Sequence, residues 1–161
     1  MKKEQIYRIL AEVTDPEIPV ITISELGILK DIEIDHSGKI IVSITPTYNG
    51  CPAMDMISVN IKSVLEEYGF YNAEVVLVME PVWTTDWITE EGRKKLLDYG
   101  ISPPAERSTD STFLSGKAPV VICPQCKSEK TEMISRFGST ACKSLYKCTD
   151  CLEPFDYFKC H

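Results

Sequence analysis

Apolar residues follow two different periods in the first part of the chain. Between residues 5 and 13 they recur at the spacing of a helix, and Asp15-Pro16 then interrupts the pattern. Residues 28–34 and 40–44 are instead rich in β-branched residues, and the polar stretch Asp35–Gly38 between them is typical of a turn. The pattern therefore predicts one helix followed by a β-hairpin.

A second helix, a third strand and a third helix are predicted next. Pro52 stands where the first turn of a helix tolerates a missing N–H, and a broad apolar face extends from it to Gly69. Residues 73–79 have the apolar composition of a strand, and Thr89 has the character of an N-cap. The expected fold class is α+β, with a small α-β-β-α-β-α domain over residues 1–100.

The composition changes after residue 100. Residues 101–118 are dominated by Ser, Thr, Pro, Gly and charged residues, as in a linker. Residues 119–161 contain only short strand-like pieces, at 120–122, 133–134 and 145–146, which is little apolar surface for an unaided fold. We expect this segment to be a short β-rich ribbon that a metal ion stabilises.

Two Cys-x-x-Cys motifs in this segment supply a set of four metal ligands. They are Cys123, Cys126, Cys148 and Cys151, and 21 residues separate the two pairs. Four thiolates on two tight turns satisfy tetrahedral Zn²⁺, so a structural zinc ribbon is the first interpretation. The same ligands suit a rubredoxin-like iron or an iron–sulfur cluster. A disulfide framework is the third alternative, and a reducing compartment argues against it.

The other three of the seven cysteines stand alone. Cys142 and Cys160 flank the second motif, where they either pack in the ribbon or add further ligands. Cys51 lies at the expected start of the second helix, whose N-terminal N–H groups are expected to lower its pKa and make it a reactive thiolate. A capping or buried cysteine is the alternative, and no histidine stands near it in the sequence.

Charge and hydropathy exclude several classes of partner. Residues 1–100 hold 17 acidic and 9 basic residues, and residues 101–161 hold 7 and 8, so neither part has the basic stripe of a nucleic-acid-binding protein. No apolar run reaches the roughly 20 residues of a membrane helix, and residues 1–5 do not begin a signal peptide. We expect a cytoplasmic protein with protein partners.

Three motifs of the first hundred residues resemble the SufT-like domain of iron–sulfur assembly and carrier proteins. The motifs are Asp15-Pro16-Glu17, Ser24-Glu25-Leu26-Gly27-Ile28 and Thr45-x-Thr47-x-x-Gly50-Cys51-Pro52. The resemblance implies that Cys51 holds or passes a transient cluster or iron, with Asp15, Glu17, Thr45 and Thr47 around it. Without the resemblance, the two acids could be solvated turn residues and the two threonines simple strand-end residues.

Over nearly its full length the chain resembles the PaaD family, also called PaaJ. Four further segments carry this resemblance: Pro81–Ile88, Gly100–Pro104, Phe137–Lys143 and Glu153–Cys160. It implies a role in aerobic phenylacetate degradation, beside an epoxidase that has a diiron subunit and an iron–sulfur flavin reductase. The chain lacks the paired helical Glu-x-x-His motifs of a diiron site and any Gly-rich dinucleotide motif. It is therefore not expected to be the catalytic subunit.

Three hypotheses follow from the sequence and the resemblance. The first is an accessory protein that matures or loads iron–sulfur or iron centres of the epoxidase. The second is a non-catalytic subunit that docks to the oxygenase complex. The third is a thiol redox enzyme, which zinc at the Cys-x-x-Cys motifs would exclude for those cysteines. The sequence leaves open a homodimer in which a cluster bridges two copies of Cys51.

Overall fold

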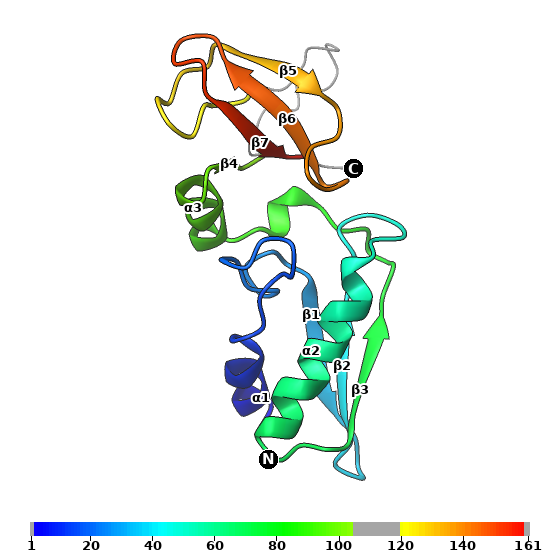
Figure 1. The fold of residues 1–161 in the computed structure, drawn as a ribbon. Helices are drawn as coiled ribbons and strands as arrows, with labels where there is room; N and C mark the ends of the chain where they lie inside the picture. The colour runs from blue at the N-terminus through cyan, green and yellow to red at the C-terminus, as the bar shows by residue number, and fades with distance from the viewer. Residues whose placement is uncertain (1, 105–119, 160–161) are drawn as a thin grey trace. The chain divides into compact units, whose positions relative to one another are not determined.

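The structure is a computed structural model that describes residues 2–104 and 120–159 (Figure 1). The chain divides into two compact units, Met1–Gly92 and Arg93–His161. The first unit has helices and a three-stranded sheet, and the second has a four-stranded sheet. The expected α+β class is confirmed.

A three-stranded sheet forms the centre of the first unit. Strands β1 (Leu29–Ile34) and β2 (Ile40–Ile44) pair antiparallel, and β3 (Ala73–Leu77) pairs parallel to β2. The carboxylate of Asp35 closes the turn between β1 and β2 by accepting the N–H groups of Ser37 and Lys39 at 2.8 and 3.0 Å. The predicted hairpin is confirmed.

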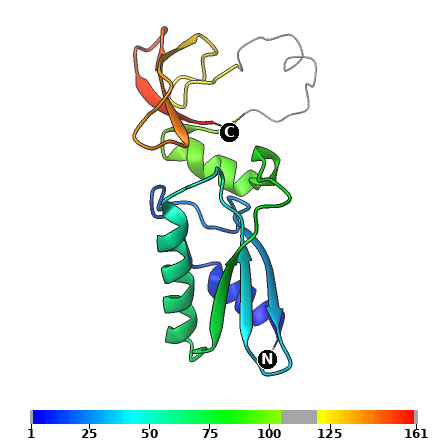
Figure 2. The ribbon, with the colours of Figure 1, turned by 90° about the vertical axis from the view of Figure 1, so that its right-hand side faces the viewer.

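Two helices accompany this sheet. Helix α2 (Ala53–Glu67) runs along one face of the sheet, as Figures 1 and 2 show, and α1 (Lys3–Leu10) contacts β1 and α2. Buried residues alternate with half-buried ones along β2, so one face of the strand carries the core. The core positions contributed by β2, α2 and α1 include Ile40, Val42, Ile44, Ile57, Ile61, Leu65, Ile6, Ile9 and Leu10.

Helix α1 is shorter than the pattern of apolar residues predicted. It ends at Leu10, although Val13 is buried as expected of a core position. The carbonyl of Val13 accepts the N–H of Ile23 at 3.0 Å, and the N–H of Asp15 donates to Ile21 at 2.9 Å. The N–H groups of Glu12 and Val13 donate to Ile9 and Leu10, three residues back, at 3.2 and 3.1 Å, so the α-helical bonding pattern stops at the end of α1.

A turn over residues 22–28 packs against the segment that follows β3. The indole N–H of Trp83 donates to the carbonyl of Leu26 at 2.9 Å, and the N–H of Thr89 donates to Glu25 at 2.9 Å. A 3-10 helix, η1 (Thr85–Trp87), lies between these two contacts. The turn is therefore held by residues about sixty positions further along the chain.

Helix α3 (Glu90–Asp98) begins where the sequence predicted, because the hydroxyl of Thr89 accepts the N–H of Gly92 at 3.0 Å. The division between the two units falls within this helix. In the described residues, no helix combines the length and the apolar composition that a membrane span requires.

The sheet of the second unit has the strand order β4-β7-β6-β5. Its strands are β4 (Ile101–Ser102), β5 (Thr131–Ser135), β6 (Lys143–Cys148) and β7 (Pro154–Phe158). All pairs are antiparallel except that of β4 with β7. A small core joins the strands to the cysteine turns, and it consists of Val121, Cys123, Cys148, Phe155 and Tyr157.

The structure corrects the start of the expected linker over residues 101–118. Ile101 and Ser102 are buried and pair with Asp156 and Tyr157 of β7, so they belong to the sheet of the second unit. The sequence did not predict this strand, because the segment is polar and only two residues pair. Such a short edge strand is defined by the strand beside it and leaves no apolar pattern in the sequence. The expected linker from residue 105 onward lies outside the described residues.

Candidate metal centre and the Cys51 site

The four cysteines of the two Cys-x-x-Cys motifs meet at one point of the second unit. The Sγ atoms of Cys123 and Cys151 are 3.7 Å apart, those of Cys126 and Cys148 are 3.5 Å apart, and all four lie within 4.8 Å of one another. Four sulfurs at about 2.3 Å from a tetrahedral zinc would be about 3.8 Å apart. The thiols are free, and their spacing fits a single metal ion.

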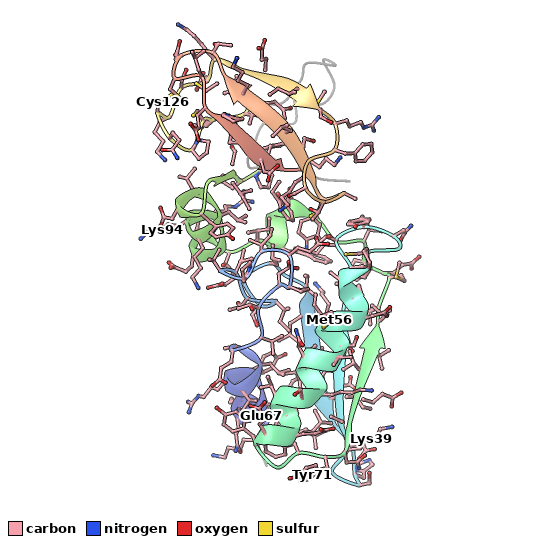
Figure 3. All side chains as sticks on the ribbon, viewed as in Figure 1. Lys39, Met56, Glu67, Tyr71, Lys94 and Cys126 are labelled. Carbon is pink, nitrogen blue, oxygen red and sulfur yellow. The ribbon has the colours of Figure 1, made fainter. Side chains whose placement is uncertain are left out.

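Each motif forms a tight turn with the same backbone feature. The residue directly after the second cysteine, Lys127 in one turn and Leu152 in the other, has a positive φ of 63° and 66°. Cys126, labelled in Figure 3, and Cys151 are exposed, whereas Cys123 and Cys148 are buried. Each turn thus offers one buried and one exposed candidate ligand.

Polar contacts hold the two turns together. The hydroxyl of Ser128 donates to the carboxylate of Asp150 at 2.6 Å, and the N–H of Thr149 donates to the carbonyl of Lys130 at 2.9 Å. These contacts link residues just after the first turn to residues within the second. They help to position the sulfur atoms before any ion binds.

Backbone N–H groups and neighbouring sulfurs set the ionisation of these thiols. The N–H groups of Cys151 and Asp150 lower the pKa of Cys148 to about 7. At Cys151 the N–H of Glu153 favours the thiolate, but partial loss of hydration and the neighbouring sulfur atoms outweigh it and raise the pKa to about 12. Four thiolates at this spacing therefore require a cation, which is what a metal ion supplies.

Of the two remaining cysteines of this unit, one lies within the described residues. Cys142 is buried and outside the four-sulfur group, with its Sγ 3.0 Å from the hydroxyl of Thr140. Its carbonyl accepts the N–H of Lys159 at 3.0 Å. Cys160 lies outside the described residues.

Cys51 lies between β2 and α2, as the sequence predicted, but its pKa moves in the opposite direction. Burial of the half-exposed side chain raises the pKa of the Cys51 thiol, and the carboxylates of Glu17 and Asp15 raise it further. The N–H of Ala53 and the hydroxyl of Tyr48 favour the thiolate without reversing the shift. The expected depression of the pKa by the helix N-terminus is therefore wrong.

The acidic turn near Cys51 is an ordered part of the first unit. Asp15 is only 7% exposed, and its carboxylate accepts the N–H groups of Glu17 and Ile18 at 2.8 and 2.9 Å. The interpretation of Asp15 as a solvated acid is therefore wrong. Glu17 is half-buried, and both carboxylates act on the Cys51 sulfur through their charge.

The two threonines differ from each other. Thr45 is 1% exposed, and among the described residues its hydroxyl oxygen is the one buried side-chain nitrogen or oxygen atom without a hydrogen-bond partner. Thr47 is half-buried in the same segment. Tyr48 is a further residue of the Cys51 site, because its hydroxyl favours the Cys51 thiolate, and the sequence did not predict this role. Its position between Thr45 and Cys51 was the feature that could have indicated it.

Known families match each unit of the chain, and a known protein matches nearly the whole chain. A family described as "Iron-sulfur cluster assembly protein" matches residues 3–76, and one described as "PaaD zinc beta ribbon domain" matches residues 107–159. A protein of Escherichia coli (strain K12), named as one of the subunits of a "Putative 1,2-phenylacetyl-CoA epoxidase", is 47% identical, over 97% of this chain and 92% of its own length.

Two further similarities cover the first unit. An "Fe-S protein maturation auxiliary factor" of Porphyromonas gingivalis (strain ATCC BAA-308 / W83) is 34% identical over 58% of this chain and 90% of its own length. The crystal structure of a domain of unknown function from Bacillus anthracis has a TM-score of 0.54 at 27% identity, over 58% of this chain and 90% of that domain. The fold of the first unit is thus shared with this Bacillus anthracis domain.

Proposed function

Because the chain belongs to the PaaD family of 1,2-phenylacetyl-CoA epoxidase subunits, we propose that it is an accessory protein of aerobic phenylacetate degradation. In this proposal it matures or loads iron–sulfur or iron centres of the epoxidase complex. Its partners are other subunits of that complex, and it works in the cytoplasm.

The observation that carries the proposal is the surroundings of Cys51. A half-buried thiol at the start of α2 is flanked by two carboxylates, within the segment that matches the iron–sulfur cluster assembly family. A cationic centre would relieve the repulsion between these carboxylates and a thiolate, so the group is suited to accept iron. The name of the Porphyromonas gingivalis relative supports the same role.

We assign the four cysteines of the ribbon to a structural zinc ion in this proposal. The all-thiolate ligand set, the spacing for one ion and the match to a zinc ribbon family support zinc. An ion held by four protein ligands has no open position for chemistry. The ribbon thus supports the fold and leaves cluster handling to Cys51.

Replacement of Cys51 in cells tests the proposal. We expect Cys51→Ser to reduce both the cluster content of the epoxidase reductase and epoxidase activity to the level of cells without the protein. Cys142→Ser is the matched control, because it removes another cysteine of the same chain outside the Cys51 site. Unchanged cluster content and activity with Cys51→Ser would refute the loading role.

A second candidate function is a docking subunit without cluster chemistry. The exposed apolar side chains of the ribbon favour it, since Met133, Ile134 and Phe137 are 55%, 53% and 60% exposed. In that case Cys51→Ser would be silent, and Ile134→Asp would abolish association with the complex together with activity. Loss of activity in Cys51→Ser with association intact would instead support cluster loading.

A further inference from the structure

Strand β3 forms one edge of the three-stranded sheet of the first unit (Figure 1), and within the described residues no strand pairs with its outer side. On its inner side, the N–H of Ile40 donates to Asn72 at 2.9 Å, and the N–H of Val78 donates to Ile44 at 2.8 Å. Successive residues of a strand direct their backbone groups to opposite sides. The residues whose groups face away from β2 are therefore Ala73, Val75, Leu77 and Met79.

This free edge is apolar and accessible. Val76, Leu77 and Met79 are 37%, 50% and 48% exposed, and Glu74 is the one charged residue between positions 73 and 79. Soluble proteins usually protect a strand edge with charges, prolines or a bulge, because an open edge pairs readily with another strand. β3 has no register shift against β2, so its edge is straight as well as unprotected.

The opposite edge of the same sheet is protected. Three of the six residues of β1 are charged, and a register shift between Leu29 and Asp31 marks a bulge. The side chains of Lys3 and Tyr7 donate to the Asp31 carboxylate at 2.5 and 3.3 Å. The sheet thus has one open edge, which allows two copies to pair and does not allow a growing fibre.

We propose that two copies of this chain pair antiparallel through the free edges of β3, about a two-fold axis at Val76. The two three-stranded sheets then form one sheet of six strands, in the order β1-β2-β3-β3-β2-β1. Six strands is a common size for a sheet. The pairing requires neither a metal ion nor Cys51, so it stands apart from the proposed function.

An axis at Val76 brings the free backbone groups of the two edges together. Val75 of one copy lies opposite Leu77 of the other, and Ala73 lies opposite Met79, so the residues that face outward exchange hydrogen bonds. Val76 meets Val76 of the second copy as a non-hydrogen-bonded pair, the arrangement in which opposite side chains are closest. The edge is therefore complementary to itself.

Neighbouring registers use the edge less completely. An axis at Leu77 would place Ala73 opposite Pro81, which has no N–H to donate. An axis at Val75 would place Met79 opposite Tyr71, which precedes the strand. The register centred on Val76 avoids both losses.

The register also keeps like charges apart. Glu74 lies opposite Val78 of the second copy, four residues from Glu74 of that copy. At about 3.3 Å per residue the two glutamates are about 13 Å apart along the strands, beyond the Debye length of about 8 Å at physiological salt. Each Glu74 is also paired with Lys39 of its own copy. The acidic character of the first unit therefore does not prevent the contact.

Opposite charges approach each other at both ends of the paired stretch. The same register places Glu80 of one copy opposite Asn72 of the other, whose carbonyl accepts the N–H of Ile40 in β2. Lys39 is the residue before Ile40, so its ammonium lies one strand away from the exposed Glu80. This complementarity favours a second copy as the occupant of the edge.

The pairing differs from a homodimer in which a cluster bridges two copies of Cys51. Because β2 runs parallel to β3, antiparallel pairing of the β3 strands directs the ends of the two β2 strands in opposite directions. Cys51 follows the end of β2, so the two thiols cannot bind one cluster. We therefore expect Cys51→Ser to leave the pairing intact.

Sedimentation equilibrium of the zinc-loaded full chain provides the first test. We expect a reversible dimer, which Val76→Lys weakens at least about tenfold, because two like charges then meet at the axis. Val59→Lys is the matched control, since Val59 is 61% exposed on α2, and it should leave the dissociation constant within about threefold. A chain that stays monomeric at about 0.1 mM would overturn the inference, as would a dimer that Val76→Lys leaves unchanged.

A mixture of Val76→Lys and Val76→Glu tests the position of the axis. Only an axis at this residue places the two substituted positions opposite each other, so the mixture should form a dimer within about threefold of the natural affinity. Each variant alone should remain weak. If the mixture fails to pair while the tryptophan fluorescence shows both variants folded, this axis is excluded.

Amide hydrogen exchange of the natural protein applies even if these variants do not fold. The N–H groups of Val75 and Leu77 should exchange at least about tenfold more slowly well above the dissociation constant than well below it. The N–H of Val78 is bonded to Ile44 in either state and should change little. Equal exchange at both concentrations would contradict the pairing. Protection that appears only when epoxidase subunits are added would identify a partner strand instead and overturn the inference.

Discussion

Cys51 is subject to two opposing local effects. The N–H of Ala53 at the start of α2 and the hydroxyl of Tyr48 stabilise its thiolate, whereas burial and the carboxylates of Glu17 and Asp15 destabilise it. The second set prevails, so the apo protein keeps Cys51 as a thiol at neutral pH. A cation at the site would reverse the balance, because it neutralises the carboxylates and binds the thiolate directly.

This balance predicts the pH dependence of Cys51 alkylation. Only the thiolate reacts with iodoacetamide, and the raised pKa means that the thiolate fraction is small at pH 7. The rate at Cys51, followed by peptide mass spectrometry on the zinc-loaded chain, should still increase above pH 9. A rate that levels off below pH 8 would show that the helix N-terminus prevails after all.

Two substitutions act as controls in this experiment, because they are expected to change the alkylation rate of Cys51 in opposite directions. Glu17→Gln removes a negative charge that disfavours the thiolate, so alkylation at a fixed pH should become faster. Tyr48→Phe removes a hydrogen bond that favours the thiolate, so alkylation should become slower. A common change in both variants would indicate altered access to Cys51 rather than an altered pKa.

At the scale of elements, the turn over residues 22–28 depends on contacts from a distant segment. Inside the turn, the N–H of Thr22 donates to the carboxylate of Glu25 at 2.9 Å, and the N–H of Glu25 donates to the Thr22 hydroxyl at 3.1 Å. Gly27 has φ +72°, and a Cβ there would lie 2.5 Å from the Cβ of Trp87. The backbone conformation and the close packing both require glycine.

Gly27→Ala is therefore expected to destabilise the first unit strongly. The positive φ costs about 1–2 kcal/mol for a residue with a Cβ, and overpacking against Trp87 adds about 1–3 kcal/mol. Both tryptophans of the chain, Trp83 and Trp87, belong to the segment that covers this turn, so urea unfolding followed by tryptophan fluorescence reports on it.

Gly38→Ala is the matched control for this substitution. Gly38 has φ +82° in the hairpin turn, but nothing lies within 4 Å of a Cβ placed there. It should therefore show only the conformational cost of about 1–2 kcal/mol. Equal losses in the two variants would mean that the contact between Gly27 and Trp87 contributes nothing to stability.

At the scale of the whole molecule, the two units differ in what stabilises them. The first unit has an extensive apolar core between its sheet and helices, which includes Ile44, Ile57 and Leu65. The core cluster of the ribbon is small, and two of its members, Cys123 and Cys148, are candidate metal ligands. A domain with so few apolar side chains depends on its metal for a large part of its stability.

Metal removal is therefore expected to unfold the ribbon and leave the first unit folded. Purified protein should contain about one zinc ion per chain. A strong chelator should release it and change the circular dichroism of the ribbon strands, while the fluorescence of Trp83 and Trp87 stays that of the folded state. Cys148→Ser should mimic the chelator. Simultaneous loss of the tryptophan signal would show that the first unit also depends on the ion.

Features that depend on neighbouring residues were predictable from the sequence. The hairpin of β1 and β2 was predicted correctly because its turn residues lie between two apolar runs. The helix cap at Thr89 was predicted correctly because capping is a contact between residues three positions apart. The ligand set of the ribbon was visible for the same reason, since the two residues within each motif fix the distance between its cysteines.

Features that depend on distant segments were decided by the tertiary structure. Strand β4 forms because β7 offers an edge, and the loop after α1 is fixed by a backbone bond between Val13 and Ile23. The direction of the Cys51 pKa shift was also decided by the tertiary structure. A helix N-terminus can be predicted from the sequence, but burial and the approach of Glu17 arise only when the loops fold together, and removal from water outweighs the helix terminus.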